Sequence, residues 1–265
     1  MLEYEFMRNA LFAILIMTPL FGLIGTVIVN NKMAFFSDAL GHSALTGIAI
    51  GALLGIVNPT ISMIIFGIVF ALLLNRIKDL KITSRDTIIS VFSSTALALG
   101  LIILSKNGNF SKFSNYLIGD ILSIVPAEIF ALLIIAVIVL AFWVLFSNKL
   151  YAISLNASLA KSKGINAKLI ENLFVVLIAI IVMISIRWVG ILIINSMLIL
   201  PAAASRNIAR NLREYHVFSV IFAMFSGILG LVISYFGEVA TGPMIVIIAS
   251  LIFFVTYFIR SRIGD

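Results

Sequence analysis

Long stretches without a charged residue run through most of this chain. An α-helix needs about 20 apolar residues to cross the hydrocarbon core of a bilayer, and most of the stretches have about that length. The stretch at 39–75 is too long for one helix, and Gly55-Ile-Val-Asn-Pro59 divides it into two. Arg187 divides another long stretch in the same way. The pattern therefore predicts nine helical segments, at residues 10–29, the two halves of 39–75, 87–105, 129–148, 172–186, 188–205, 217–237 and 239–259.

The composition indicates a membrane protein. Of 265 residues, 62% are apolar and only 11% are charged, and the mean hydropathy is +1.22. Soluble domains are about half apolar and a quarter charged, so both an ordinary soluble enzyme and a disordered chain are excluded. We predict an all-α fold, a polytopic transmembrane bundle of eight or nine helices that forms a single domain over residues 1–265. An eight-helix version would merge two weak segments, near Asn58 or near Arg187.

The basic residues predict the orientation, because they gather in the cytoplasmic loops of membrane proteins. With nine spans and a cytoplasmic C-terminus, 14 of the 18 basic residues fall in inside loops and the N-terminus lies outside. These 14 residues are Lys32, Arg76, Lys78, Lys81, Arg85, Lys149, Lys161, Lys163, Lys168, Arg206, Arg210, Arg213, Arg260 and Arg262. The net charge of +7 therefore reflects orientation in a membrane rather than binding to nucleic acid. The chain has no cysteine, which excludes disulfides and thiolate metal sites.

One pair of ionisable residues stands inside the apolar sequence. In Phe36-Ser-Asp-Ala-Leu-Gly-His-Ser-Ala-Leu-Thr-Gly47, Asp38 and His42 are four residues apart, on one face of a helix. A carboxylate and an imidazole suit Zn²⁺, Mn²⁺ or Fe²⁺, and two chains across a two-fold axis would supply four ligands. The small residues around the pair would let two such helices approach closely. The alternative is structural: Asp38 caps the start of the helix and His42 bonds to it or to a neighbour.

The segment from Ala202 to Leu212 carries arginines at helical spacing between small and apolar positions. We expect a surface helix here that lies against lipid headgroups or docks a cytoplasmic partner. Other polar residues have weaker claims to a role. Three acids lie in predicted outer loops, where an entry to a path through the membrane could be: Glu238, Asp120 and Glu128. His216 is expected at the start of a helix on the cytoplasmic side rather than in a metal site.

These residues resemble the ABC-3 metal permeases, the membrane subunits of zinc, manganese and iron importers of the ATP-binding-cassette class. Three stretches carry the likeness, and together with weaker matches at Ser158 to Gly164 and at Tyr116 to Ser123 they span nearly the whole chain in order. They are Met33-Ala-Phe-Phe-Ser-Asp-Ala-Leu-Gly-His-Ser-Ala-Leu-Thr-Gly47, Val189-Gly-Ile-Leu-Ile-Ile-Asn-Ser-Met-Leu-Ile-Leu-Pro-Ala-Ala-Ala204 and Thr241-Gly-Pro-Met-Ile-Val246.

The resemblance implies a type II importer in which Asp38 and His42 coordinate the transported metal. It also implies that the segment from Pro201 to Arg213 contacts the ATPase, and its candidate docking residues are Ala202, Ala203, Ala204, Arg206, Arg210 and Arg213. The implied partners are a second permease subunit, in a homodimer, a cytoplasmic ATPase dimer and an extracellular or periplasmic metal-binding protein. The implied location is the bacterial cell (inner) membrane. No tightly bound cofactor is expected besides the divalent ion that is carried.

Three other classes of protein compete with this interpretation. A type II permease for metal chelates such as iron-siderophores or cobalamin would need a wide pore and no inward-facing Asp–His pair. A secondary transporter would work alone on an ion gradient. An intramembrane enzyme is disfavoured because the chain has no paired aspartates, no His-Glu-x-x-His and no serine–histidine arrangement. The sequence also lacks a Gly-x-x-x-x-Gly-Lys-Ser/Thr phosphate loop, so ATP hydrolysis is expected in a separate chain.

Overall fold

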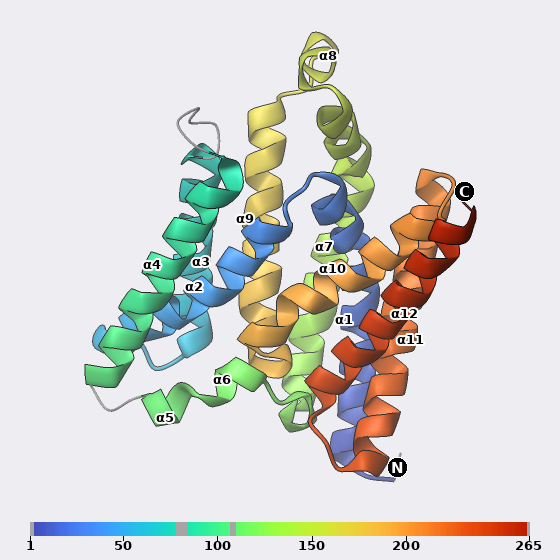
Figure 1. The fold of residues 1–265 in the computed structure, drawn as a ribbon. Helices are drawn as coiled ribbons and strands as arrows, with labels where there is room; N and C mark the ends of the chain where they lie inside the picture. Colours follow the sequence, from blue (N-terminus) through green and yellow to red (C-terminus); the bar gives the residue numbers. More distant parts are fainter. Residues whose placement is uncertain (1–2, 78–83, 107–109, 264–265) are drawn as a thin grey trace. The chain divides into compact units, whose positions relative to one another are not determined.

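The computed structural model describes residues 3–77, 84–106 and 110–263, and within these ranges the chain is helical and contains no β-strand (Figure 1). Nine of the described helices have 18 or more residues and follow the nine predicted segments in order. They are α1 (Glu5–Asn30), α2 (Ala34–Leu53), α3 (Pro59–Ile77), α4 (Arg85–Lys106), α7 (Pro126–Leu155), α9 (Ala167–Val189), α10 (Ile191–Ile208), α11 (Leu212–Gly237) and α12 (Thr241–Ile263). The predicted fold class is confirmed.

Eight of these nine helices are long and apolar enough to cross a bilayer. The ninth, α2, has 20 residues but is not among the eight. It carries Asp38 and His42 together with several serine, threonine and glycine residues, which lower its hydropathy. The helix with the candidate chemistry is therefore the one long helix that is not among the candidate membrane spans of the described residues.

The chain divides into two compact units, and two long helices contribute residues to both. The first unit comprises residues 1–31, 120–147 and 195–265, which include α1, most of α7 and α10, and all of α11 and α12. The short 3₁₀ helix η1 (Ile121–Ser123) also belongs to it. The second unit comprises residues 32–119 and 148–194. It includes α2, α3, α4 and α9 with the short helices α5 (Phe110–Phe113), α6 (Asn115–Ile118) and α8 (Ala157–Ser162).

Close backbone contact joins α1 to α11 in the first unit. The Ser219 hydroxyl of α11 donates a hydrogen bond of 2.7 Å to the Gly22 carbonyl of α1. A Cβ atom on Gly22 would lie 2.9 Å from the Ser219 carbonyl oxygen, closer than side chains tolerate. Small residues at such positions let membrane helices pack backbone to backbone.

Close backbone contact also joins α2 to α4 in the second unit. The Thr46 hydroxyl of α2 donates to the Ala96 carbonyl of α4. One turn further along α4, a Cβ atom on Gly100 would lie 2.7 Å from the Thr46 backbone nitrogen. This contact holds α2, the helix of the Asp–His pair, against a neighbour on its packed side.

The contact at Gly100 predicts that Gly100→Val destabilises the protein, because the added atoms meet backbone rather than a flexible side chain. Overpacking of this kind costs about 1–3 kcal/mol. Ala98→Val, at an exposed position of the same helix, is the matched control and should cost less than about 0.5 kcal/mol. Thermal unfolding of the detergent-purified variants measures both effects, and equal midpoints for the two variants would contradict the prediction.

Candidate functional site

Asp38 and His42 lie one turn apart on α2, as their spacing predicts. The distance between Asp38 Oδ2 and His42 Nε2 is 3.7 Å, and the two side chains are 46% and 32% exposed. The helix begins at Ala34 after Met33, and no side chain caps it. Asp38 therefore stands in the second turn, and the alternative in which it caps the helix is wrong.

The pair lies on the one side of the first half of α2 that the chain leaves open. Phe35, Asp38 and His42 recur at helical spacing, and Phe35 is 58% exposed. The residues on the other faces of these turns are buried: Phe36, Ser37, Ala39, Leu40, Gly41, Ser43 and Ala44. Packing therefore fixes the helix from one side and leaves the carboxylate and the imidazole accessible from the other.

The geometry of the pair suits two ligands of one metal ion. With bonds of about 2.1 Å, neighbouring ligand atoms of a tetrahedral site lie about 3.4 Å apart. The observed 3.7 Å needs only a small side-chain adjustment to reach this spacing. In the part of the chain that the structure describes, no group of three or more His, Cys, Asp or Glu residues is placed to hold a metal. If the pair binds a metal, one copy of the chain supplies only two of the four ligands of a tetrahedral site.

Two of the other candidate acids make local structural contacts. Asp120 Oδ1 accepts a hydrogen bond of 3.0 Å from the Leu122 N–H at the start of η1. Glu128 Oε2 accepts one of 3.2 Å from the Val125 N–H at the start of α7. Glu238 follows the last residue of α11 and has a left-handed backbone conformation with φ of 52°. These contacts give Asp120 and Glu128 a local structural role.

His216 lies within the first unit and takes part in packing there. Its Nδ1 is 3.0 Å from Thr26 Oγ1, and its ring meets the Trp143 ring edge-on with centroids 4.9 Å apart. Among the described residues, it belongs to no group of three or more His, Cys, Asp or Glu residues that could hold a metal ion. That His216 is not a metal ligand stays a prediction.

The predicted surface helix from Ala202 to Leu212 is wrong as a continuous helix. α10 ends at Ile208, and α11 begins at Leu212 after a turn. The Asn211 side chain accepts from the Glu214 N–H at 2.9 Å, and the Glu214 carboxylate accepts from the Arg210 N–H at 2.9 Å. This reciprocal capping at Asn211-Leu-Arg-Glu214 starts a new helix, and the arginine spacing alone concealed it.

The predicted docking residues on the two sides of this turn differ in how exposed they are to solvent. Ala202 and Ala204 are fully buried within the chain, whereas Arg206, Arg210 and Arg213 are exposed. Lys78 and Lys81, predicted on the same side of the membrane, lie outside the described residues. Ala203 is intermediate in exposure, so the three arginines are the most exposed of the six predicted docking residues.

A second exposed segment is the short helix α8. α8 begins after Asn156, whose side chain accepts from the Leu159 N–H at 3.0 Å, and it is followed by Gly164 with φ of 78°. Leu155 is 85% exposed and Leu159 is 56% exposed. The combination of exposed leucines with Lys161 and Lys163 is a signal for a docking surface that composition alone does not separate from an ordinary loop.

A polytopic helical bundle with a half-exposed carboxylate and imidazole on one long helix is the architecture of a membrane transport protein. The chain belongs to the ABC 3 transport family, which it matches over residues 3–260. The resemblance inferred from the sequence motifs is thus confirmed, and the protein is a multi-pass membrane protein.

Relatives match along nearly their whole length. The chain is 32% identical to the high-affinity zinc uptake system membrane protein ZnuB of Haemophilus influenzae, over 98% of this chain and 100% of that protein. It is 28% identical to the manganese transport system membrane protein MntC of Listeria monocytogenes, over 100% of this chain and 94% of that protein. The solved structure of PsaBC from Streptococcus pneumoniae in complex with Fab is similar with a TM-score of 0.85 and 30% identity, covering 97% of this chain and 92% of the matched chain.

The capping contact at the turn between α10 and α11 predicts the effect of Asn211→Ala. Loss of an N-cap side chain costs about 1 kcal/mol, and we expect the backbone amide of Glu214 to exchange its hydrogen faster. Leu212→Ala, an exposed neighbour without a capping role, is the control. Hydrogen–deuterium exchange with mass spectrometry of peptides that cover 209–218 makes the comparison. Unchanged exchange in Asn211→Ala would mean that other contacts hold the turn.

Proposed function

We propose that this chain is the membrane-spanning permease subunit of an ATP-driven importer of a divalent transition metal ion. Zinc and manganese are the favoured cargo, because the relatives at 32% and 28% identity are named as zinc and manganese transport proteins. The observation that carries the proposal is the pair Asp38 and His42, with ligand atoms 3.7 Å apart on the open side of α2. Aspartate and histidine accept zinc, manganese and iron, so the ligand types alone do not select among them.

A second copy of the chain completes the proposed site. Two α2 helices related by a two-fold axis bring together two carboxylates and two imidazoles, which is a tetrahedral ligand set. The ion meets this set on its way through the membrane and is released when the two copies move apart. A transport site must bind weakly enough to let its ion leave, and a set shared between two moving subunits satisfies this requirement.

The energy for this movement comes from a separate ATPase chain in the proposal. The permease has no phosphate-binding loop of its own and is not itself an enzyme. We place the ATPase on the cytoplasmic side, at Arg206, Arg210 and Arg213, and we place the C-terminus on the same side. α8 is the alternative docking surface. An extracellular metal-binding protein delivers the ion on the opposite side of the bacterial cell membrane.

Removal of either ligand should stop transport. Asp38→Asn and His42→Gln keep the size of each side chain but weaken metal coordination, and even loss of an outer hydrogen-bond partner of a ligand costs about 10–100-fold. We therefore expect uptake of zinc or manganese to fall by at least about tenfold. Uptake of the radioactive ions into cells that express the whole transporter measures this. The matched controls are Asp86→Asn, an exposed acid of α4, and His216→Gln.

The dimer can be tested separately because the chain contains no cysteine. The single variants Asp38→Cys and His42→Cys should each be joined into a dimer by a short bifunctional thiol reagent, because ligands of one ion lie too far apart for a direct disulfide, while Asp86→Cys, at an exposed position of α4, should not. Normal metal uptake by both Asp38→Asn and His42→Gln would overturn the metal site. Loss of uptake without cross-linking at either position would overturn only the arrangement of four shared ligands.

Charge reversal tests the docking surface. We expect the double variant Arg210→Glu/Arg213→Glu to lower the amount of ATPase that co-purifies with the permease by at least about fivefold, because like charges then face the bound partner. Arg260→Glu, an exposed basic residue of α12, is the control. If the double variant keeps its ATPase while Leu159→Ala/Lys161→Glu loses it, docking belongs to α8 instead.

A further inference from the structure

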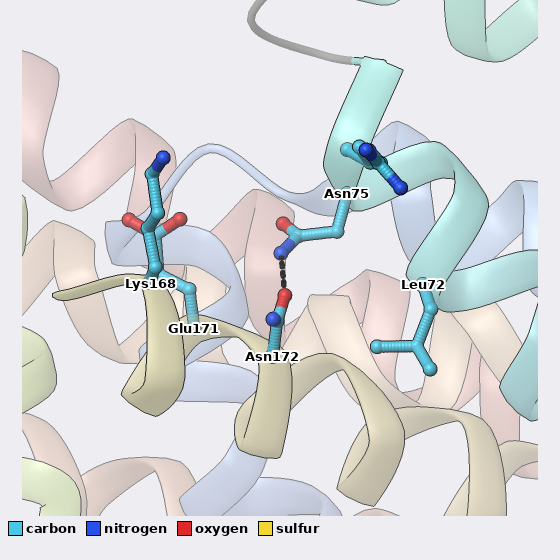
Figure 2. Close-up of a pocket in the computed structure, with 6 residues that line it drawn as sticks. Leu72, Asn75, Lys168, Glu171 and Asn172 are labelled. Atoms are coloured by element: carbon cyan, nitrogen blue, oxygen red, sulfur yellow. Dashed lines mark hydrogen bonds between the residues drawn. The ribbon is translucent and has the colours of Figure 1, made fainter. Parts of the chain in front are cut away.

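A pocket of about 420 Å³ opens between the end of α3 and the start of α9, both in the second unit. Its lining is polar apart from one leucine: Leu72, Asn75, Arg76, Lys168, Glu171 and Asn172 (Figure 2). The volume lies in the range of small-ligand pockets, about 300–1,000 Å³. The pocket lies where two apolar helices reach their polar ends, which is the level of lipid headgroups if both helices span the membrane.

A buried amide in this pocket keeps an unused acceptor. Asn75 is 6% exposed, and its Nδ2 donates a hydrogen bond of 2.7 Å to Asn172 Oδ1. Asn75 Oδ1 has no hydrogen-bond partner. In Figure 2 this oxygen points away from Asn172, toward the side on which Lys168 and Glu171 lie. A buried carbonyl without a donor destabilises the structure, so a ligand that brings an N–H or O–H group to this place would be stabilised.

The charged residues around the pocket favour a ligand that carries both a negative and a positive group. Arg76 and Lys168 are exposed cations at its rim, and a guanidinium with an ammonium suits a phosphate. Glu171 adds a carboxylate on the side to which Asn75 Oδ1 points. A phosphate alone satisfies the cations but not the carbonyl oxygen, whereas a primary ammonium next to the phosphate satisfies both.

The side of α3 below the pocket favours a lipid over a soluble molecule. Ile61, Ile65 and Val69 are 50%, 57% and 61% exposed, and Leu72 and Arg76 continue the same face at helical spacing. This face forms an aliphatic stripe that ends at the cations of the pocket. An acyl chain laid along the stripe places its own headgroup in the pocket.

We propose that this pocket binds an aminophospholipid of the phosphatidylethanolamine type. The lipid phosphate bonds to Arg76 and Lys168, and its ammonium donates to Asn75 Oδ1 and pairs with Glu171. Basic pockets between membrane helices are known places for lipid headgroups. The proposal depends on the membrane location of α3 and α9 and not on which ion the chain carries.

Native mass spectrometry of the full-length chain, titrated with lipids of identical acyl chains, tests the site. We expect phosphatidylethanolamine to bind at least about tenfold more tightly than phosphatidylcholine, whose quaternary ammonium has no N–H; this is the effect of one hydrogen bond to a charged group. The exposed double variant Arg76→Gln/Lys168→Gln should bind phosphatidylethanolamine at least about tenfold more weakly. Asn75→Leu should abolish the preference over phosphatidylcholine, and Lys163→Gln, an exposed cation outside the pocket, should change nothing.

Three results would overturn the proposal. Equal binding of phosphatidylethanolamine and phosphatidylcholine would show that the lipid ammonium does not donate a hydrogen bond to Asn75 Oδ1. Tighter binding of phosphatidylglycerol would indicate a site for a phosphate alone. Free phosphoethanolamine that displaces the lipid at equal concentration would indicate a soluble ligand. The Arg76→Gln/Lys168→Gln variant changes only exposed side chains, so it remains decisive if Asn75→Leu does not fold.

Discussion

Backbone-to-backbone packing of membrane helices is the constraint on which this structure depends. Lipid tails are as apolar as leucine side chains, so burial of hydrophobic surface does not by itself hold such helices together. Close approach at small residues does, as where α1 meets α11 at Gly22 and where α2 meets α4 at Gly100. At both places a hydroxyl, from Ser219 or Thr46, donates to a carbonyl of the neighbouring helix. These bonds satisfy polar groups that the hydrocarbon cannot solvate.

The same constraint explains why the candidate metal site has the form it has. α2 is rich in small residues because three neighbours, α3, α4 and α9, pack against it. With those faces occupied, Asp38 and His42 share the remaining side of its first turns. Because α2 is firmly packed, its carboxylate and imidazole are held in position. The proposed site then needs only two further ligands, from a second copy of the chain. Packing inside the chain thus uses one side of α2, and the proposed coordination between two chains would use the opposite side.

The length of the charge-free stretches predicted the long helices well, because an apolar stretch of about 20 residues usually forms a helix that spans the membrane. The order of all nine and the break at Gly55–Pro59 were readable in this way. The pairing of Asp38 with His42 followed from helical spacing alone. The end of α10 could not be predicted from the sequence, because arginines at helical spacing continue across the turn. Only the capping contact between Asn211 and Glu214 shows that a new helix starts there. The pocket at Asn75 and Asn172 was also unreadable, since it joins residues 97 positions apart.

The open side of α2 has a consequence for the life of the chain in a cell. Asp38 lies in the second turn of α2, and an ionisable side chain inside a membrane almost always faces a partner or a water-filled cavity rather than lipid. In the proposed arrangement, a copy without its partner leaves this carboxylate and imidazole uncovered. The contact that completes the proposed site would therefore also shield two polar side chains from lipid, so assembly and site formation would be one event.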